Sequence, residues 1–213
     1  SNTYSWTYDG TGPTMTITSS TVSSGASTTT AAVALTFTSN EATSNFAQAD
    51  ITETGCSLGT FAASSSTVYT DTCTASSDGT PSISVAADAF SDAASNGNAV
   101  SNTYTWTYDT TGPTMTITSA TVSSGASTAT AAVALTFTSN EATSDFAVGD
   151  ITAGSCSLGS FAATSSTVYT DTCTASSDGS PSVSVAAGTF SDVSGNTNSV
   201  SNTYTWTYDG TGP

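Results

Sequence analysis

The chain contains no lysine, arginine or histidine, while sixteen aspartate and glutamate residues give it a formal net charge of −16 over 213 residues. Nucleic acids and anionic membrane surfaces are bound through clustered basic side chains. Their absence therefore excludes both as partners. Metal ions and cationic partners are compatible with this charge.

The same absence argues against catalysis. Without histidine or lysine, no ordinary base is present to activate the many serine hydroxyls. A carboxylate pair can hydrolyse glycosides, but no pair here lies in a motif that indicates a cleft. Long apolar runs are also missing, so no window predicts a membrane helix. We expect neither an enzyme nor membrane insertion.

Serine and threonine supply 87 of the 213 residues, and they alternate with apolar side chains in stretches such as "TMTITS", "VALTFTS" and "TVYTDTC". A period of two is typical of a strand with one buried face. Aromatic and β-branched residues are too frequent for a disordered chain. The sequence therefore predicts a folded all-β protein.

The chain repeats itself at a period of one hundred residues. Residues 1–100 and 101–200 align without a gap and share 79 identities, and the differences cluster around 45–55 and 88–99. One hundred residues are enough for an independent domain with its own core. We expect residues 13–112 to form repeat 1 and 113–213 to form repeat 2 with a trailing linker. Residues 1–12 match the last strand and linker of a preceding repeat, which indicates a piece of a longer array.

One repeat contains seven candidate strands, separated by turn-rich segments such as "SSGAST" and "SSDGTP". Seven short alternating strands in about one hundred residues favour an immunoglobulin-like β-sandwich, with a closed barrel as the alternative. The predicted strands are Thr14–Ser19, Ala32–Ser39, Phe46–Thr52, Cys56–Ala62, Thr67–Ala75, Ser82–Ala87 and Asn102–Tyr108.

Three aromatic residues, Tyr104, Trp106 and Tyr108, fall on one face of the last predicted strand. Such a row can bind sugars, but aromatics opposite a threonine face are more typical of an inward-facing strand. We therefore assign them to the core. The other predicted core residues of repeat 1 are Leu35, Phe37, Phe46, Ile51, Leu58, Phe61, Tyr69, Val85 and Phe90.

Four cysteines form one pair in each repeat, Cys56 with Cys73 and Cys156 with Cys173. If the intervening segment is a hairpin that turns near Ser64, the two cysteines of a pair lie opposite each other, as a disulfide requires. Free thiols and a zinc site are the alternatives, and zinc lacks histidine and further thiolate ligands here. Disulfides indicate an oxidising compartment, so we expect an extracellular or cell-surface protein.

The string "YDTTGPTMTITS … ALTFTSNEATSDFAVGDIT … VSVAAGTFSDVSGNTNSVSNTYTWTYD" resembles the bacterial Ig-like repeats of large secreted adhesins and surface proteins. The resemblance covers each whole repeat through D-x-T-x-P, S-N-E-A-T-S, D-I-T and S-D-x-x-G-N. It implies tandem Ig-like domains. The cysteine pair is a departure, as is Ser95, which stands where Gly195 completes the S-D-x-x-G-N turn of repeat 2.

Strand order places three acidic side chains at one end of each predicted sandwich. No basic residue is present to neutralise them, and like charges repel by about 1 kcal/mol at 4 Å in water. Calcium takes six to eight oxygen ligands of the kinds available here, so Ca²⁺ is the candidate cofactor. Solvated loop acids are the simpler alternative. The candidate ligands are Asp9, Glu41 and Asp92 in repeat 1 and Asp109, Glu141 and Asp192 in repeat 2.

Two functions fit these features. In the first, stiff "TGP" linkers join the domains end to end in the shaft of an extracellular fibre, stalk or adhesin. The partners would then be neighbouring repeats or further copies of the chain, joined covalently or by donation of the strand Asn2–Tyr8. In the second, each repeat binds a glycan or a host-surface protein, and the two variable segments form the walls of its pocket.

Overall fold

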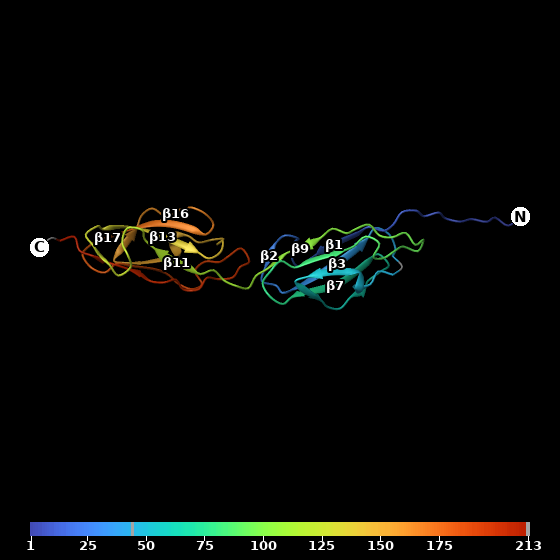
Figure 1. The fold of residues 1–213 in the computed structure, drawn as a ribbon, viewed down its shortest axis with the longest axis horizontal. Coiled ribbons are helices and arrows are strands. Elements are labelled where there is room, and N and C mark those ends of the chain that lie inside the picture. The colour runs from blue at the N-terminus through green and yellow to red at the C-terminus, as the bar shows by residue number, and fades with distance from the viewer. Residues whose placement is uncertain (44, 212–213) are drawn as a thin grey trace. The chain divides into compact units, whose positions relative to one another are not determined.

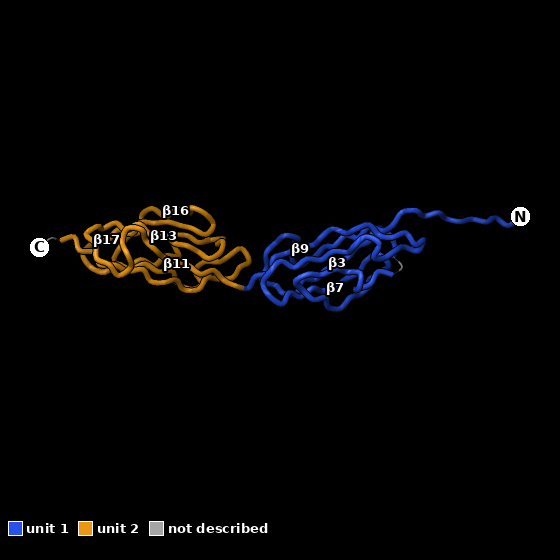
Figure 2. Tube along the Cα trace, viewed as in Figure 1, with its two compact units in different colours: residues 1–110 blue, residues 111–213 orange. Residues whose placement is uncertain are grey.

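The structure is a computed structural model that describes residues 1–43 and 45–211. The chain divides into two compact units, Ser1–Thr110 and Thr111–Pro213, which are coloured blue and orange in Figure 2. The regular secondary structure of the described residues is β, apart from two single 3₁₀ turns. This confirms the predicted fold class.

The larger sheet of unit 1 is antiparallel, in the order β1-β3-β7-β5, with β6 also paired to β7 (Figure 1). The central pair β3 and β7 places Val33 opposite Cys73 and Phe37 opposite Tyr69. The strands are β1 (Met15–Ser19), β3 (Ala32–Ser39), β5 (Cys56–Leu58), β6 (Ala62–Ala63) and β7 (Val68–Ala75).

The smaller sheet of unit 1 has the order β4-β8-β9, and a short parallel pair joins β10 to β2. These strands are β2 (Ser27–Thr28), β4 (Ile51–Thr54), β8 (Ser82–Val85), β9 (Tyr104–Thr105) and β10 (Thr107–Tyr108). A 3₁₀ turn, η1 (Gln48–Asp50), leads into β4.

Unit 2 repeats this topology strand for strand. Its sheets have the orders β11-β13-β17-β15, with β16 beside β17, and β14-β18-β19, together with the pair β12-β20. The elements are β11 (Met115–Thr118), β12 (Ser127–Thr128), β13 (Ala132–Ser139), η2 (Val148–Asp150), β14 (Ile151–Gly154), β15 (Cys156–Leu158), β16 (Ala162–Ala163), β17 (Val168–Ala175), β18 (Ser182–Val185), β19 (Tyr204–Thr205) and β20 (Thr207–Tyr208).

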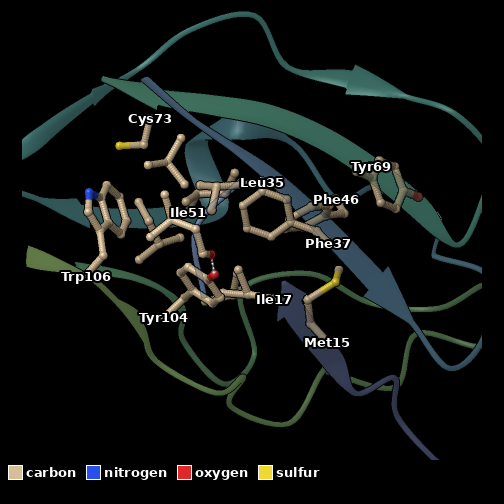
Figure 3. Close-up of a cluster of buried hydrophobic side chains, with 14 of the residues drawn as sticks. Met15, Ile17, Leu35, Phe37, Phe46, Ile51, Tyr69, Cys73, Tyr104 and Trp106 are labelled. Atoms are coloured by element: carbon tan, nitrogen blue, oxygen red, sulfur yellow. Dashed lines mark hydrogen bonds between the residues drawn. The ribbon is translucent and has the colours of Figure 1, made fainter. Parts of the chain in front are cut away.

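The core of unit 1 lies between the two sheets, where alternate residues of each strand point inward (Figure 3). Figure 3 shows Leu35 and Phe37 from β3 beside Ile51 from β4, with the Trp106 indole at one end of the cluster. Nine of the twelve predicted core side chains belong to this buried cluster. Leu58, Phe61 and Tyr108 are only partly buried and pack against its edge.

Three predicted strands are wrong in detail, and one of them, Asn102–Tyr108, is interrupted at Trp106, so that β9 pairs with β8 and β10 pairs with β2. The segment predicted as Phe46–Thr52 forms η1 before β4 begins at Ile51, because Asp50 Oδ2 accepts a hydrogen bond from Ala47 N–H at 2.8 Å and closes a local turn. The segment predicted as Cys56–Ala62 breaks into β5 and β6. The strand β2 was not predicted.

Residues 1–8 form no strand, although their sequence nearly repeats that of β9 and β10. Tyr4, Trp6 and Tyr8 are 88%, 72% and 81% exposed, whereas the corresponding Tyr104 and Trp106 are 4% and 0% exposed. The same residue pattern is therefore core in one place and solvent-exposed in another. What differs is the presence of β8 and of a sandwich for the strand to complete.

Candidate metal centre

A disulfide joins Cys56 to Cys73 in unit 1 and Cys156 to Cys173 in unit 2, with Cα atoms 5.7 and 5.6 Å apart. The predicted pairing is present, but the predicted register is wrong. Cys56 lies opposite Ala75, and Leu58 lies opposite Cys73, so the bridge runs diagonally between β5 and β7. The register is shifted by two residues along β7, and the hairpin closes at Ser64–Val68, where the amides of Ser64 and Ser65 both donate to Val68 O.

Asp92 is the most buried member of the predicted acidic set, at 4% exposure. It lies in a bridge to Thr43 and accepts hydrogen bonds from Asn96, whose backbone amide reaches Oδ1 at 2.8 Å and whose Nδ2 reaches Oδ2 at 2.9 Å. The Asn96 side-chain hydrogen bond lowers the pKa of Asp92 below its ordinary value, aided by backbone amides of the same turn, although burial acts in the opposite direction. Asp92 is therefore held as a carboxylate.

Glu41 lies two residues after β3, and its pKa is shifted in the opposite direction from that of Asp92. Its Oε1 atom is buried and has no hydrogen-bond partner. Desolvation raises the pKa of Glu41, and the charges of Asp9 and Asp92 raise it further. A buried carboxylate oxygen without a donor is unfavourable unless a cation or water satisfies it.

Asp9 belongs to the segment that leads into the first domain. Its Oδ1 accepts a hydrogen bond from Thr11 N–H at 3.1 Å, and its backbone carbonyl accepts one from Asn96 Nδ2 at 3.2 Å. Farther along, Thr14 N–H donates to Asn40 Oδ1 at 2.7 Å. These contacts hold the leading segment against the loops that carry Glu41 and Asp92.

The three side chains come together as the sequence predicts. One carboxylate oxygen of each of Asp9, Glu41 and Asp92 lies within 4.8 Å of the others. They border a hollow of about 470 Å³, which Thr7, Ala42, Ala93 and Ala94 also line. Three carboxylates, one of them with an unsatisfied buried oxygen, form a donor set that suits a hard divalent cation.

In repeat 2 the predicted ligands are divided by the boundary between the units. Asp109 belongs to unit 1, where its amide donates to Thr28 O at 3.1 Å. Asp192 is 3% exposed and accepts two hydrogen bonds from Asn196, at 2.9 and 2.8 Å. Each unit thus builds the same Asp–Asn turn. The grouping of Asp109 with Glu141 and Asp192 stays a prediction.

Sequence reasoning missed two buried carboxylates in the middle of a strand. Asp71 is 3% exposed, its Oδ1 accepts from the amides of Gly59 and Thr72, and its Oδ2 accepts from Gln48 Nε2 at 2.7 Å. In unit 2, Val148 replaces that glutamine and Asp171 Oδ2 is buried without a partner. The alternation in "TVYTDTC" places this aspartate on the inward face, so the sequence pattern alone could have identified it as buried.

A second hollow, of about 560 Å³, lies beside Gln48 in unit 1. It lies between η1 and β4 on one side and β5 on the other. The strands β4 and β5 are edge strands of the smaller and the larger sheet, respectively. Its lining residues are Gln48, Ala49, Ile51, Glu53, Ser57 and Leu58.

A family model described as bacterial Ig-like domain matches the chain twice, over residues 9–108 and 109–208. The chain belongs to the bacterial Ig-like domain family. This confirms the resemblance noted in the sequence, and the two matches are in tandem. None of the curated proteins compared with the chain matches it.

Several solved structures are similar to these Ig-like domains. Yersinia pseudotuberculosis InvD is 16% identical, with a TM-score of 0.45 over 92% of this chain and 57% of InvD. Invasin, a bacterial integrin-binding protein, is 14% identical, with a TM-score of 0.47 over 80% of this chain and 36% of invasin. The D00-D0 domain of intimin is 13% identical, with a TM-score of 0.42 over 90% of this chain and 98% of that structure. The chain thus spans less than two thirds of InvD and of invasin.

None of the described helices has the length and apolar character needed to cross a membrane.

Proposed function

We propose that these Ig-like domains are repeating structural units of an extracellular shaft, in a fibre, a stalk or an adhesin, and that they have no enzymatic role. The observation that carries this proposal is the tandem family match, in which each unit has a complete core and its own disulfide. A disulfide within one domain stabilises that domain without any contribution from its neighbours. The disulfides also support a location outside the reducing cytosol.

We further propose that calcium stiffens the shaft. In unit 1, Asp9, Glu41 and Asp92 would hold the ion, and Asp9 is on the leading segment while the others are on loops of the domain. A shared ion would tie the segment to the domain and relieve the repulsion that raises the pKa of Glu41. Asp109, Glu141 and Asp192 are the corresponding residues of repeat 2.

Calorimetric titration of the two-repeat protein with calcium tests the ion. We expect saturable binding and a higher melting temperature, both reduced in the double variant Glu41→Gln, Glu141→Gln. Glu53→Gln is the matched control, because Glu53 is an exposed carboxylate on β4 outside the acidic set. No binding heat together with an unchanged melting temperature would exclude calcium. Small-angle scattering tests the shaft, since a stiff linker predicts a narrow distribution of particle lengths that calcium narrows further.

A second candidate function, a multivalent module that binds a glycan or a protein, is favoured by the hollow beside Gln48. Four of its six lining residues fall within the variable segment 45–55, and repeat 2 has Val148, Gly149 and Ala153 where repeat 1 has Gln48, Ala49 and Glu53. The two repeats would then prefer different ligands. Glycan-array binding by the protein, lost on Gln48→Val with Glu53→Ala, would favour this function over the shaft. The absence of binding would favour the shaft.

A further inference from the structure

We propose that Asn96 is a site of spontaneous deamidation, and that the corresponding Asn196 of repeat 2 is protected. Asn96 is followed by Gly97, and this Asn–Gly step occurs once in the sequence. Deamidation begins when the backbone nitrogen of the next residue attacks the asparagine Cγ. Glycine offers the least hindered nitrogen and the most mobile backbone for that attack. Repeat 2 has the β-branched Thr197 in its place.

The local structure leaves the reacting nitrogen available. The bridge between Ser91 and Gly97 is closed by Asp92 N–H, which donates to Asn96 O at 3.2 Å, and by Asn98 N–H, which donates to Phe90 O at 3.0 Å. The Gly97 amide takes part in neither bond. Gly97 is also exposed, so water can reach the intermediate.

Asp88 disfavours a larger residue at position 97. A Cβ there would overlap Asp88 Oδ1, so the Asp88 side chain would have to move. In repeat 2 both positions change together, to Gly188 and Thr197. The reactive Asn–Gly step and the aspartate beside it are therefore one structural feature of repeat 1.

The reaction balances with water alone. Gly97 N forms a bond to Asn96 Cγ, the Cγ–Nδ2 bond breaks, and Nδ2 leaves as ammonia with the proton from the Gly97 amide. Water then opens the resulting succinimide at either carbonyl. Opening at one carbonyl gives aspartate, and opening at the other gives isoaspartate, which lengthens the main chain by one carbon.

The product alters the acidic set of unit 1. Asn96 Nδ2 donates to Asp92 Oδ2 at 2.9 Å and to the Asp9 carbonyl at 3.2 Å. Deamidation replaces this donor with a carboxylate oxygen that faces Asp92, so an attraction becomes a repulsion between like charges. We expect deamidated unit 1 to be less stable than intact unit 1 when no divalent cation is present.

The test incubates the two-repeat protein in warm, mildly alkaline buffer and digests it with a glutamate-specific protease. Cleavage after Glu53 and Glu141 separates Asn96, in residues 54–141, from Asn196, in residues 142–213. We expect the mass gain of one NH₂-to-OH exchange at residue 96, located by fragmentation, together with isoaspartate detected by enzymatic methylation. No gain at residue 96, or an equal gain at Asn196, would overturn the proposal.

Two variants complete the test. The double variant Asp88→Gly, Gly97→Thr copies the pair that repeat 2 already accommodates, and we expect it to fold and to lose the mass gain. Asn96→Asp mimics one product, and we expect a lower melting temperature of unit 1 in chelator. Retention of the gain in the double variant, or unchanged melting of Asn96→Asp, would contradict the respective step. Neither readout requires calcium binding, so failure here is separate from failure of the proposed calcium site.

Discussion

Removal of the unit 1 disulfide by Cys56→Ala with Cys73→Ala should destabilise that unit and leave unit 2 unchanged. The bridge closes a loop with a sequence separation of 17. The chain-entropy relation gives about 3 kcal/mol for a loop of this size. For a domain of about 100 residues this corresponds to a fall of roughly 12 °C or more in melting temperature. Domains are stable by only about 5–15 kcal/mol, so the loss is a large fraction of the total.

Tryptophan fluorescence during urea unfolding measures this loss. The chain has three tryptophans, so Trp6→Phe with Trp206→Phe leaves Trp106, which is fully buried in unit 1, as the single reporter. The pair Cys156→Ala, Cys173→Ala in the same background is the matched control and should leave the Trp106 transition in place. A loss below about 1 kcal/mol would refute the reasoning, since removal of a native disulfide from a small domain typically costs 2–5 kcal/mol.

Three further predictions concern the polar contacts. Gln48→Val should destabilise unit 1 by about 1–3 kcal/mol, because it leaves a buried carboxylate oxygen without its donor, and Val148→Gln should stabilise unit 2 on the same denaturation assay. Gly97→Thr alone should destabilise unit 1, whereas adding Asp88→Gly should restore it, a coupling that a double-mutant cycle measures. In calcium-free buffer, protonation of Glu41 removes its repulsion from Asp9 and Asp92. The resulting stabilisation should be fully present below about pH 4.3 and should be lost as the pH rises through the raised folded pKa of Glu41. Thermal melts across that range should show a flatter profile for Glu41→Gln, and an unchanged profile would contradict the assigned repulsion.

The fold could be predicted because inward-facing and outward-facing residues alternate along each strand. In β3 the alternation of Val33, Leu35 and Phe37 with small or polar residues is sufficient to assign the strand and its buried face. This alternation does not determine the pairing register of two strands, because the register depends on where the turn between them closes. The serine-rich run at 63–66 offers several positions of similar composition, and the structure uses the later one, so Cys56 lies opposite Ala75.

The acidic set was predictable for a different reason. Strand order alone brings the loop after β3 and the loop that follows Phe90 to the same end of the domain, so Glu41 and Asp92 had to be neighbours. Their different environments were not predictable. The pKa of Asp92 is lowered because the Asn96 side chain donates to it, whereas the pKa of Glu41 is raised by desolvation and by the charges of Asp9 and Asp92. Such a difference depends on side-chain geometry, which no residue pattern encodes.

The differences between the repeats separate the two candidate functions. In the loop of residues 88–97 two of the changes occur together, since repeat 1 pairs Asp88 with Gly97, where a Cβ would overlap Asp88 Oδ1, and repeat 2 pairs Gly188 with Thr197. The leading segment also lies close to this loop in both units. A Cβ on Gly12 would overlap Gly97 O, and a Cβ on Gly112 would overlap Thr197 O. Sequence drift here therefore preserves the approach that places Asp9 beside Asp92.

The changes around the hollow beside Gln48 lack such compensation. Val148 removes the donor to the buried aspartate and leaves Asp171 Oδ2 unsatisfied, and Ala153 removes a surface carboxylate from the lining. A pocket under selection for one ligand would not change its polar lining in this way between otherwise nearly identical repeats. The features held constant are the core, the disulfide and the three acidic residues of the set, on which the proposed shaft depends.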